Sequence, residues 1–254
     1  MDGDGDTNIV SASLNNSNNN ISWYENLDGL GDFGNQEIIS TDVDQATFVY
    51  AGDLDGDNDI DIFSASFLDH KIAWYENIDG LGNFGSQQLL TRYCGSCLLY
   101  PIDFDMDGDI DFITPSGQGG KMAWFENIDG LGQFSNQIIL TDSADFVRYI
   151  LLVDIDGDND KDIVGFSHSV DRIIWYENLG GSLGSPKVML TEVEDLNTIR
   201  AMDMDNDGDL DLISASWDQK LAWYENMDGL GDFGNQQIIS NETGNRLQVG
   251  DLNG

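Results

Sequence analysis

Short apolar stretches separated by runs of Asp, Asn and Gly recur along the whole chain. In one copy of this pattern the stretches are about Thr47–Gly52, Ile60–Ser66, Lys71–Ile78 and Gln87–Thr91. Each is rich in β-branched, aliphatic or aromatic residues and is bounded by turn-forming residues, as is typical of β-strands. No stretch of about ten residues has the period of an amphipathic helix. The pattern therefore predicts an all-β protein.

The motif W-Y/F-E-N recurs about every 50 residues and divides the chain into repeats. Its copies begin at Trp23, Trp74, Trp124, Trp175 and Trp223. Four strands in about 50 residues, repeated in tandem, are typical of a β-propeller blade, whereas the coils of a β-solenoid are usually shorter. We therefore expect a single β-propeller domain over residues 1–254. Its repeats are expected at about 1–52, 53–102, 103–153, 154–202 and 203–254.

The two ends of the chain match parts of the same segment. Residues 1–13 resemble residues 54–66, and the last six residues resemble residues 51–56. A strand at 246–250 that pairs with residues 9–13 would close a ring and leave no sheet edge unpaired. The sequence thus predicts a propeller of five four-stranded antiparallel blades, closed through the termini. The alternative is that the chain was cut from a longer array.

Aspartates occupy alternate positions in a segment about 21 residues before each of the last four W-Y/F-E-N copies. The segments read DLDGDNDID from Asp53, DFDMDGDID from Asp103, DIDGDNDKD from Asp154 and DMDNDGDLD from Asp203. Carboxylates at this spacing repel one another strongly, so such a segment is costly without a cation. Oxygen ligands in a flexible loop favour Ca²⁺ over zinc or copper. The sequence therefore predicts about one Ca²⁺ per repeat.

The spacing within each aspartate segment resembles that of an EF-hand loop, without its glutamate at position 12 and its flanking helices. By analogy, positions 1, 3, 5 and 9 supply side chains and position 7 supplies a backbone carbonyl. The predicted ligands of the four continuous segments are Asp53, Asp55, Asp57, Asp59, Asp61; Asp103, Asp105, Asp107, Asp109, Asp111; Asp154, Asp156, Asp158, Asp160, Asp162; and Asp203, Asp205, Asp207, Asp209, Asp211. A fifth segment is divided between the termini and is expected to be the weakest, with Asp251, Asp2, Asp4, Asp6 and the neutral Asn8.

The overall charge of the chain limits its partners. The 254 residues include 47 acidic and 10 basic ones, for a formal charge of −37. Such a field repels phosphate backbones and anionic headgroups, which argues against nucleic acid and membrane surfaces. Apolar residues make up 40% of the chain, enough for a core. No apolar run is long enough for a membrane span, and the polar N-terminus implies that any export signal has been removed.

Phe-Gly turns complete the repeat motif at residues 33–34, 84–85 and 233–234, while Phe134-Ser135 and Leu183-Gly184 depart from it. Together with the aspartate segments and the W-Y-E-N strand, these turns resemble the FG-GAP (VCBS-type) repeats of integrin α-subunit propellers and of many secreted bacterial proteins. The resemblance covers all five repeats. It implies a Ca²⁺-bearing β-propeller, usually secreted or on the cell surface and often used in adhesion or carbohydrate recognition. Propellers of this family commonly have seven blades with longer repeats.

Differences between the repeats indicate where a ligand could bind. The W-Y/F-E-N residues recur in every repeat and are expected to pack and hydrogen-bond between blades, so five catalytic glutamates in that motif are not expected. The turn after the second strand varies instead, and in an up-and-down blade it lies opposite the metal loops. Exposed aromatic rings beside Asp, Asn or Gln suit sugar binding; the alternative is ordinary surface turns. The candidate ligand-binding residues are Phe67, Asp69, His168, Trp217 and Asp218.

Cys94 and Cys97 lie in one linker, between the second and third repeats. A local disulfide is the expected form in an exported protein. A redox C-x-x-C would need a thioredoxin-like βαβ setting, which the pattern lacks. A zinc site would need further ligands, and His70 and His168 lie in other turns.

These observations favour a non-catalytic, calcium-stabilised propeller outside the cell that binds a glycan or protein ligand, and we expect a monomer. One alternative is a polysaccharide-degrading enzyme, a glycoside hydrolase or a lyase, which needs a carboxylate pair that breaks the symmetry of the repeats. Glu192, Glu194 and Asp195 form the acidic cluster of that kind. The other alternative is a spacer in a larger surface protein. The fold alone does not decide among these functions.

Overall fold

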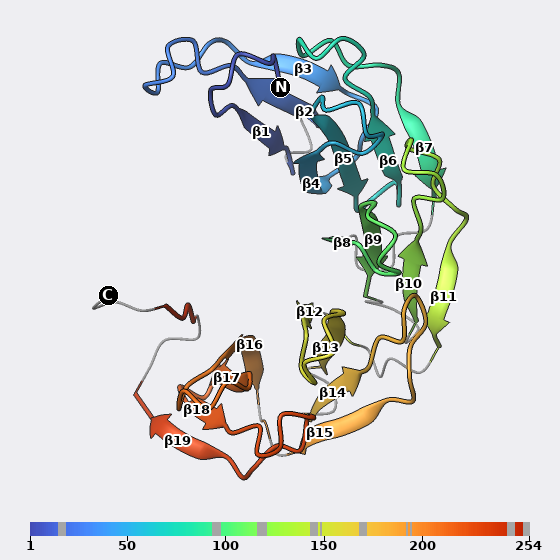
Figure 1. The fold of residues 1–254 in the computed structure, drawn as a ribbon. Coiled ribbons are helices and arrows are strands. Elements are labelled where there is room, and N and C mark those ends of the chain that lie inside the picture. The colour runs from blue at the N-terminus through green and yellow to red at the C-terminus, as the bar shows by residue number, and fades with distance from the viewer. Residues whose placement is uncertain are drawn as a thin grey trace. The chain divides into compact units, whose positions relative to one another are not determined.

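β-strands account for all the regular structure in the described part of the chain (Figure 1). The computed structural model describes residues 1–14, 19–92, 98–115, 121–142, 147, 149–167, 172–191, 193, 195–242 and 247–250. Among these residues, no helix is long and apolar enough to cross a membrane. The chain divides into two compact units, residues 1–103 with 107–139 and residues 104–106 with 140–254, and each is described by itself.

Three antiparallel sheets, which we call blades 1 to 3, lie mainly in the first unit (Figure 1). Blade 1 contains β1 (Ile9–Ala12), β2 (Ile21–Tyr24) and β3 (Glu37–Ser40). Blade 2 contains β4 (Ala46–Gly52), β5 (Asp61–Ser66), β6 (Ile72–Tyr75) and β7 (Gln88–Thr91). Blade 3 contains β8 (Tyr100–Ile102), β9 (Asp111–Thr114), β10 (Met122–Phe125) and β11 (Ile138–Thr141). Strands that follow one another in the sequence are neighbours in each sheet, which is the up-and-down order expected.

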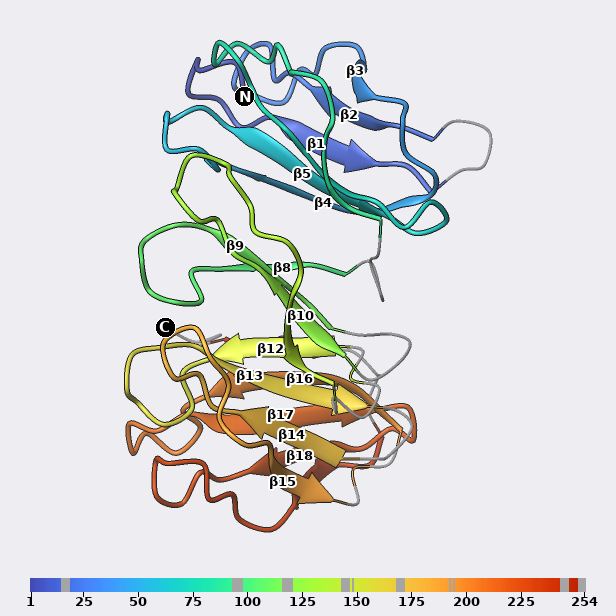
Figure 2. The same cartoon turned by 90° about the vertical axis from the view of Figure 1, so that its right-hand side faces the viewer.

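Blades 4 and 5 form the second unit, and Figure 2 shows their two sheets packed on each other. Blade 4 contains β12 (Tyr149–Val153), β13 (Asp162–Ser167), β14 (Arg172–Tyr176) and β15 (Lys187–Thr191). Blade 5 contains β16 (Leu196–Met202), β17 (Asp211–Ser216), β18 (Leu221–Tyr224) and β19 (Gln237–Ser240). Each of the five sheets therefore contains one copy of W-Y/F-E-N, as the repeats predicted. The first strand of a sheet, such as β4, comes before the aspartate segment, so the sheets begin a few residues before the expected repeat bounds.

The four strands predicted in the second repeat are confirmed, and one end differs by several residues. The third strand ends at Tyr75 rather than at Ile78. Its ladder stops there because the backbone N–H of Asn77 donates to the carboxylate of Asp61 instead of to a neighbouring strand. Asn77 then forms an isolated bridge with Phe84, which closes the Gly-rich loop between them.

Blade 1 differs from the other sheets because three strands, not four, belong to it in the described part of the chain. Residues 247–250, most of the segment expected to supply its missing strand, are not in a strand. Closure through the termini and the assignment of residues 1–254 to a single domain both stay predictions.

Apolar side chains from successive blades form the cores of both units. In the first unit, the rings of Phe63 (blade 2) and Phe112 (blade 3) are fully buried and stack with centroids 3.7 Å apart. In the second unit, Trp175 of blade 4 belongs to one cluster with Leu212 and Tyr224 of blade 5. Both faces of a sheet are buried where blades stack, which explains why the strand sequences are nearly continuous apolar runs.

Candidate metal loops and ligand-binding turns

Each aspartate segment lies at the loop between the first and second strands of its blade. We call these loop 2 (residues 53–61), loop 3 (103–111), loop 4 (154–162) and loop 5 (203–211), by the number of the blade. In each, three carboxylates offer oxygen atoms that all lie within 4.8 Å of one another and could hold a metal ion. The three are Asp53, Asp55, Asp57 in loop 2; Asp103, Asp105, Asp107 in loop 3; Asp154, Asp156, Asp158 in loop 4; and Asp203, Asp205, Asp211 in loop 5.

The first aspartate of a loop folds the backbone around itself. In loop 2, Asp53 accepts hydrogen bonds from the backbone N–H of Gly56 at 2.8 Å and of Asn58 at 3.1 Å. Gly56 and Asn58 have φ values of 76° and 72°, in the left-handed region. Gly and Asn adopt this conformation more readily than other residues, which explains the G and N between the aspartates. The turn thereby brings alternate carboxylates to one side of the loop.

The ninth aspartate of each loop is buried and bound to backbone groups. In loop 2, Asp61 is 1% exposed and accepts hydrogen bonds from Asn77 N (2.8 Å, to Oδ1) and Leu54 N (3.2 Å, to Oδ2). Asp162 and Asp211 bind the equivalent two N–H groups. A carboxylate oxygen has two lone pairs, so these bonds leave acceptor capacity for a cation. The ninth aspartate thus ties its loop to the W-Y/F-E-N motif, and its predicted role as a metal ligand stays a prediction.

The seventh aspartate turns its side chain toward the Gly-rich loop that follows W-Y/F-E-N. In blade 3, a Cβ atom on Gly130 would lie 2.5 Å from Asp109 Oδ1. Gly130 also has a φ of +62°, so a larger residue would be both strained and obstructed. This packing fits the expectation that position 7 offers its backbone carbonyl, not its side chain, to a metal.

The divided loop of blade 1 is described in part. Asn8 donates to Asp2 Oδ1 at 3.1 Å and accepts from Asn26 N at 2.8 Å, so its amide takes the place of the ninth aspartate. The N–H of Asp6 donates to Asp4 Oδ1 at 2.9 Å. Asp251 lies outside the described residues, and the completion of this loop stays a prediction.

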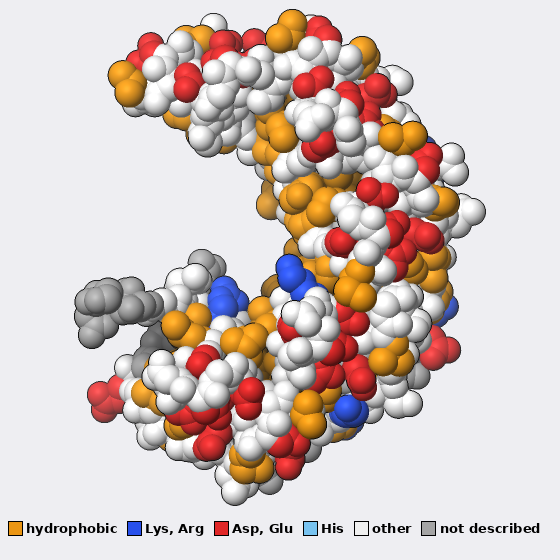
Figure 3. Space-filling view, in the orientation of Figure 1, with side chains coloured by type: hydrophobic (Ala, Val, Ile, Leu, Met, Phe, Trp, Pro, Cys, Tyr) orange, Lys and Arg blue, Asp and Glu red, His pale blue; other side chains and the backbone are white. Residues whose placement is uncertain are grey.

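Burial and mutual repulsion raise the pKa of several of these carboxylates. Burial raises the pKa of Asp61 and of Asp162 to about 6. Burial, and then the charge of Asp158, raise the pKa of Asp160 to about 6. Burial and the charge of Asp57 also raise the pKa of Asp55. Figure 3 shows that acidic side chains greatly outnumber basic ones on the face drawn, so few protein cations are there to offset the charge.

These pKa shifts predict how the metal-free protein responds to pH. Asp61 and Asp162 have a pKa of about 6 in the folded state, against an ordinary aspartate value of 3.8. The folded state therefore binds more protons between these values, and its stability falls as the pH rises through this window. In EDTA we expect the melting temperature to rise when the pH is lowered from about 7 to about 5. A cation would replace the protons, so the calcium-loaded protein should lack this rise; equal pH profiles would contradict the prediction.

The predicted ligand-binding aromatic residues lie on equivalent turns of blades 2 and 5. Phe67 is 43% exposed and Trp217 is 58% exposed. The backbone N–H of Phe67 donates to Gln45 O and that of Trp217 donates to Asp195 O, each at 2.9 Å. One backbone hydrogen bond therefore anchors each turn at its aromatic residue, and more than two fifths of that residue is exposed.

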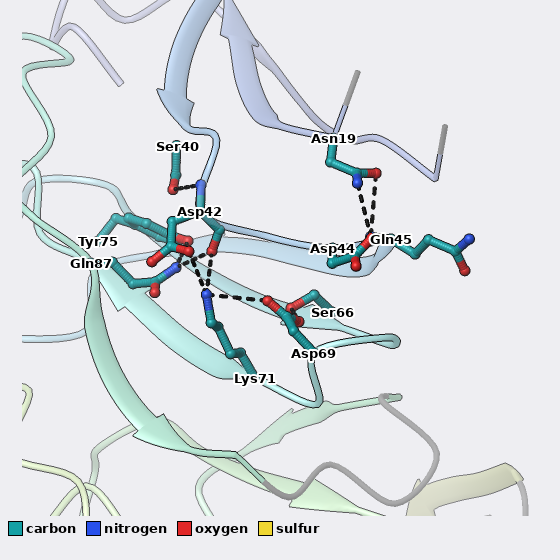
Figure 4. A network of polar contacts seen from close by, with 10 residues as sticks. All are labelled: Asn19, Ser40, Asp42, Asp44, Gln45, Ser66, Asp69, Lys71, Tyr75 and Gln87. Carbon is teal, nitrogen blue, oxygen red and sulfur yellow. Dashed lines mark hydrogen bonds and ion pairs between the residues drawn. The ribbon is translucent and has the colours of Figure 1, made fainter. Parts of the chain in front are cut away.

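The two predicted acidic ligand-binding residues brace these turns. In blade 2, Asp69 accepts from Ser66 Oγ and pairs with Lys71 Nζ at 3.2 Å. Lys71 is buried and also pairs with Asp42 Oδ1 at 2.6 Å, as Figure 4 shows. In blade 5, Asp218 repeats the arrangement with Ser216 and with Lys220 Nζ at 2.6 Å. Hydrogen bonds from Lys220 and Ser216 lower the pKa of Asp218, which keeps this brace ionised.

Sequence reasoning did not identify the lysine of this brace. The sequence contains a pattern that could have indicated it, because S-A-S is followed by Asp and then Lys in both SASFLDHK and SASWDQK. His168, Cys94, Cys97, Glu192 and Glu194 lie outside the described residues. The structure therefore does not describe the predicted disulfide, and of the acidic cluster in the enzyme alternative it describes only Asp195.

Comparison with solved structures shows the same fold in longer chains. One is a lectin of Agrocybe aegerita that recognises non-reducing terminal N-acetylglucosamine, at 19% identity and a TM-score of 0.64; the match covers 93% of this chain and 67% of the lectin. Another is a protein of Lactobacillus plantarum, at 13% identity and a TM-score of 0.55, over 94% of this chain and 69% of that protein. No curated protein matches the chain.

The repeats themselves match one family along the whole chain. The FG-GAP-like repeat matches residues 1–64, 53–114, 103–165, 154–214 and 203–254. This confirms the resemblance found from the aspartate segments and the W-Y/F-E-N motif. The chain is an all-β protein of β-propeller type, and it belongs to the FG-GAP-like repeat family.

Proposed function

We propose that this chain is a calcium-stabilised, non-catalytic binding module of a secreted or cell-surface protein, with a glycan or protein ligand. The four continuous loops support the choice of calcium. Each gathers three carboxylates, with neither thiolate nor imidazole among them. A flexible set of oxygen ligands suits a hard cation with variable coordination, which Ca²⁺ is.

Trp217 is the observation that carries the proposal of a glycan ligand. More than half of this large ring is exposed, on a turn fixed by Asp195 O and braced by the Asp218–Lys220 pair. A rigid exposed indole offers a flat surface on which the apolar face of a pyranose can stack, at little entropic cost. Phe67 offers the same at the equivalent turn of blade 2.

The charge of the protein and the ligand of a structurally similar lectin indicate which sugar to test first. A chain with a formal charge of −37 repels sulfated and uronic polymers, so neutral sugars are favoured. The structurally similar lectin recognises terminal N-acetylglucosamine. A polymer of N-acetylglucosamine is therefore the first ligand to test, in millimolar calcium.

Replacing the exposed ring tests this proposal. We expect Trp217→Ala to weaken binding to immobilised polymeric N-acetylglucosamine by about tenfold, the effect of about 1.4 kcal/mol of lost stacking. The melting temperature and calcium content should not change, because the ring is exposed. The matched control is Leu230→Ala. Leu230 belongs to the same blade and is 61% exposed, but it lies in the Gly-rich loop, away from the proposed ligand-binding turn. Equal binding by parent and Trp217→Ala, or equal weakening by Leu230→Ala, would contradict the assignment.

A further inference from the structure

The asparagine of W-Y/F-E-N connects the aspartate loops of two successive blades. In blade 3, the backbone N–H of Asn127 donates to Asp111 Oδ1 of its own loop at 2.8 Å. Its side-chain Nδ2 donates to Leu54 O in loop 2 of the preceding blade, at 2.9 Å. Asn127 is 1% exposed, so both hydrogen bonds are shielded from water. One residue therefore holds a group in each of two candidate metal loops.

The same connection recurs in blades 2, 4 and 5. In each case the side-chain amide donates to the carbonyl of the residue at position 2 of the preceding segment. The pairs are Asn77 with Met1 O at 2.8 Å, Asn178 with Phe104 O at 2.8 Å and Asn226 with Ile155 O at 3.2 Å. All three asparagines also donate their backbone N–H to the ninth aspartate of their own loop. Recurrence at four places indicates a constraint shared by the repeats.

The carbonyl that accepts this bond lies between the first two aspartates of the preceding loop. Leu54 is between Asp53 and Asp55, and its carbonyl belongs to the peptide group that leads into Asp55. The N–H of Leu54 donates to Asp61, the ninth aspartate of the same loop. A continuous path of hydrogen bonds and single residues thus leads from the carboxylates of loop 2 to those of loop 3.

Loop 2 also approaches the Gly-rich loop of blade 3, which in turn contacts loop 3. A Cβ atom on Gly56, in loop 2, would lie 3.2 Å from the carbonyl oxygen of Gly130 in blade 3. Gly130 in turn lies against Asp109 of loop 3. A displacement of one loop therefore reaches the other by this second contact as well.

We propose that these asparagines couple neighbouring calcium loops, so that Ca²⁺ bound in one loop raises the affinity of the next. Without a cation, the carboxylates of a loop repel one another and the loop samples several arrangements. A cation fixes the loop and with it the carbonyl at position 2, which orients the asparagine of the next blade. The next loop then loses less conformational freedom when it binds its own cation. This proposal rests on the calcium binding proposed above.

The test is a double-mutant cycle on the full chain, read by calcium titration calorimetry. Asp55→Asn with Asp57→Asn silences loop 2, and Asn127→Ala breaks its connection to loop 3. In the parent, silencing loop 2 should lower the calcium affinity of loop 3 by about fivefold, which is the lower end of typical coupling between two sites. In the Asn127→Ala background the same silencing should change the remaining affinities by much less. The matched control is Asn26→Ala, because the Asn26 amide donates to Thr7 O within its own repeat.

The outcomes separate the coupling from the calcium binding on which it rests. A parent that binds no calcium overturns both. A parent that binds calcium at loops whose affinities do not depend on loop 2, or a cycle in which Asn127→Ala leaves the dependence intact, overturns the coupling alone. If Asn127→Ala does not fold, Asn226→Ala, which breaks the equivalent link to Ile155, replaces it. That cycle silences loop 4 with Asp156→Asn and Asp158→Asn and measures the calcium affinity of loop 5.

Discussion

Removing calcium is expected to lower the melting temperature of this protein by about 10 to 25 °C. Calcium modules outside the cell bind with dissociation constants of about 10⁻⁴ to 10⁻³ M. At ten times the dissociation constant each site adds about 1.4 kcal/mol, so the four continuous loops add about 6 kcal/mol. In a protein of this size, 1 kcal/mol shifts the melting temperature by about 2 to 4 °C. The measurement is scanning calorimetry in about 10 mM CaCl₂ and in EDTA.

Two controls assign this effect to the aspartate loops. Magnesium should restore less stability than calcium, because Mg²⁺ requires a small octahedral shell and gives up its waters reluctantly. The variant Asp55→Asn with Asp57→Asn should lose part of the shift, since loop 2 is one of the four continuous loops. Identical melting curves in calcium and in EDTA would contradict the role of these loops as calcium sites.

Removing the ring of Phe112, which lies in the contact between blades 2 and 3, should have the second largest effect on the stability of the protein. Phe112 is fully buried, stacks on Phe63 and meets the ring of Tyr50 edge-on at a centroid distance of 5.7 Å. Phe112→Ala removes a blade 3 ring that packs against blade 2 and leaves a cavity, at a cost of about 3 to 5 kcal/mol in the free energy of unfolding. The midpoint of urea unfolding in saturating calcium measures this cost.

The matched control for Phe112→Ala removes the same side chain from the surface. Phe67 is 43% exposed, so Phe67→Ala should change the free energy of unfolding by less than about 1 kcal/mol. Comparable losses in both variants would mean that the contact between blades 2 and 3 is not a main source of stability.

The repeats allowed most of the fold to be predicted from the sequence. Strands such as Asp61–Ser66 are short, apolar and bounded by Asp and Gly, and these local signals recur in every repeat. The aspartate loops were equally visible, because their chemistry depends on spacing within nine consecutive residues. Because the same pattern occurs in every repeat, each predicted strand and loop was supported by several copies of its signal rather than by one.

Contacts between residues far apart in the sequence could not be predicted in the same way. The bond from Asn127 to Leu54 joins residues 73 positions apart, and it depends on how one blade stacks on the next. The ionic brace of Asp69 by Lys71 is local, yet the pairing of Lys71 with Asp42 again spans 29 positions. The sequence predicted that W-Y/F-E-N packs and hydrogen-bonds between blades, as its asparagine does, but not that the acceptor is a carbonyl of the preceding aspartate loop.

The number of calcium ions bound per chain tests the central claim most directly. Native mass spectrometry after exchange into millimolar calcium should show at least four ions on the parent chain. The variant Asp55→Asn with Asp57→Asn should show one ion fewer at saturation, because it removes two of the three clustered ligands of loop 2. A parent chain that carries no calcium, or a variant that carries as many ions as the parent, would contradict the claim that each aspartate loop is a calcium site.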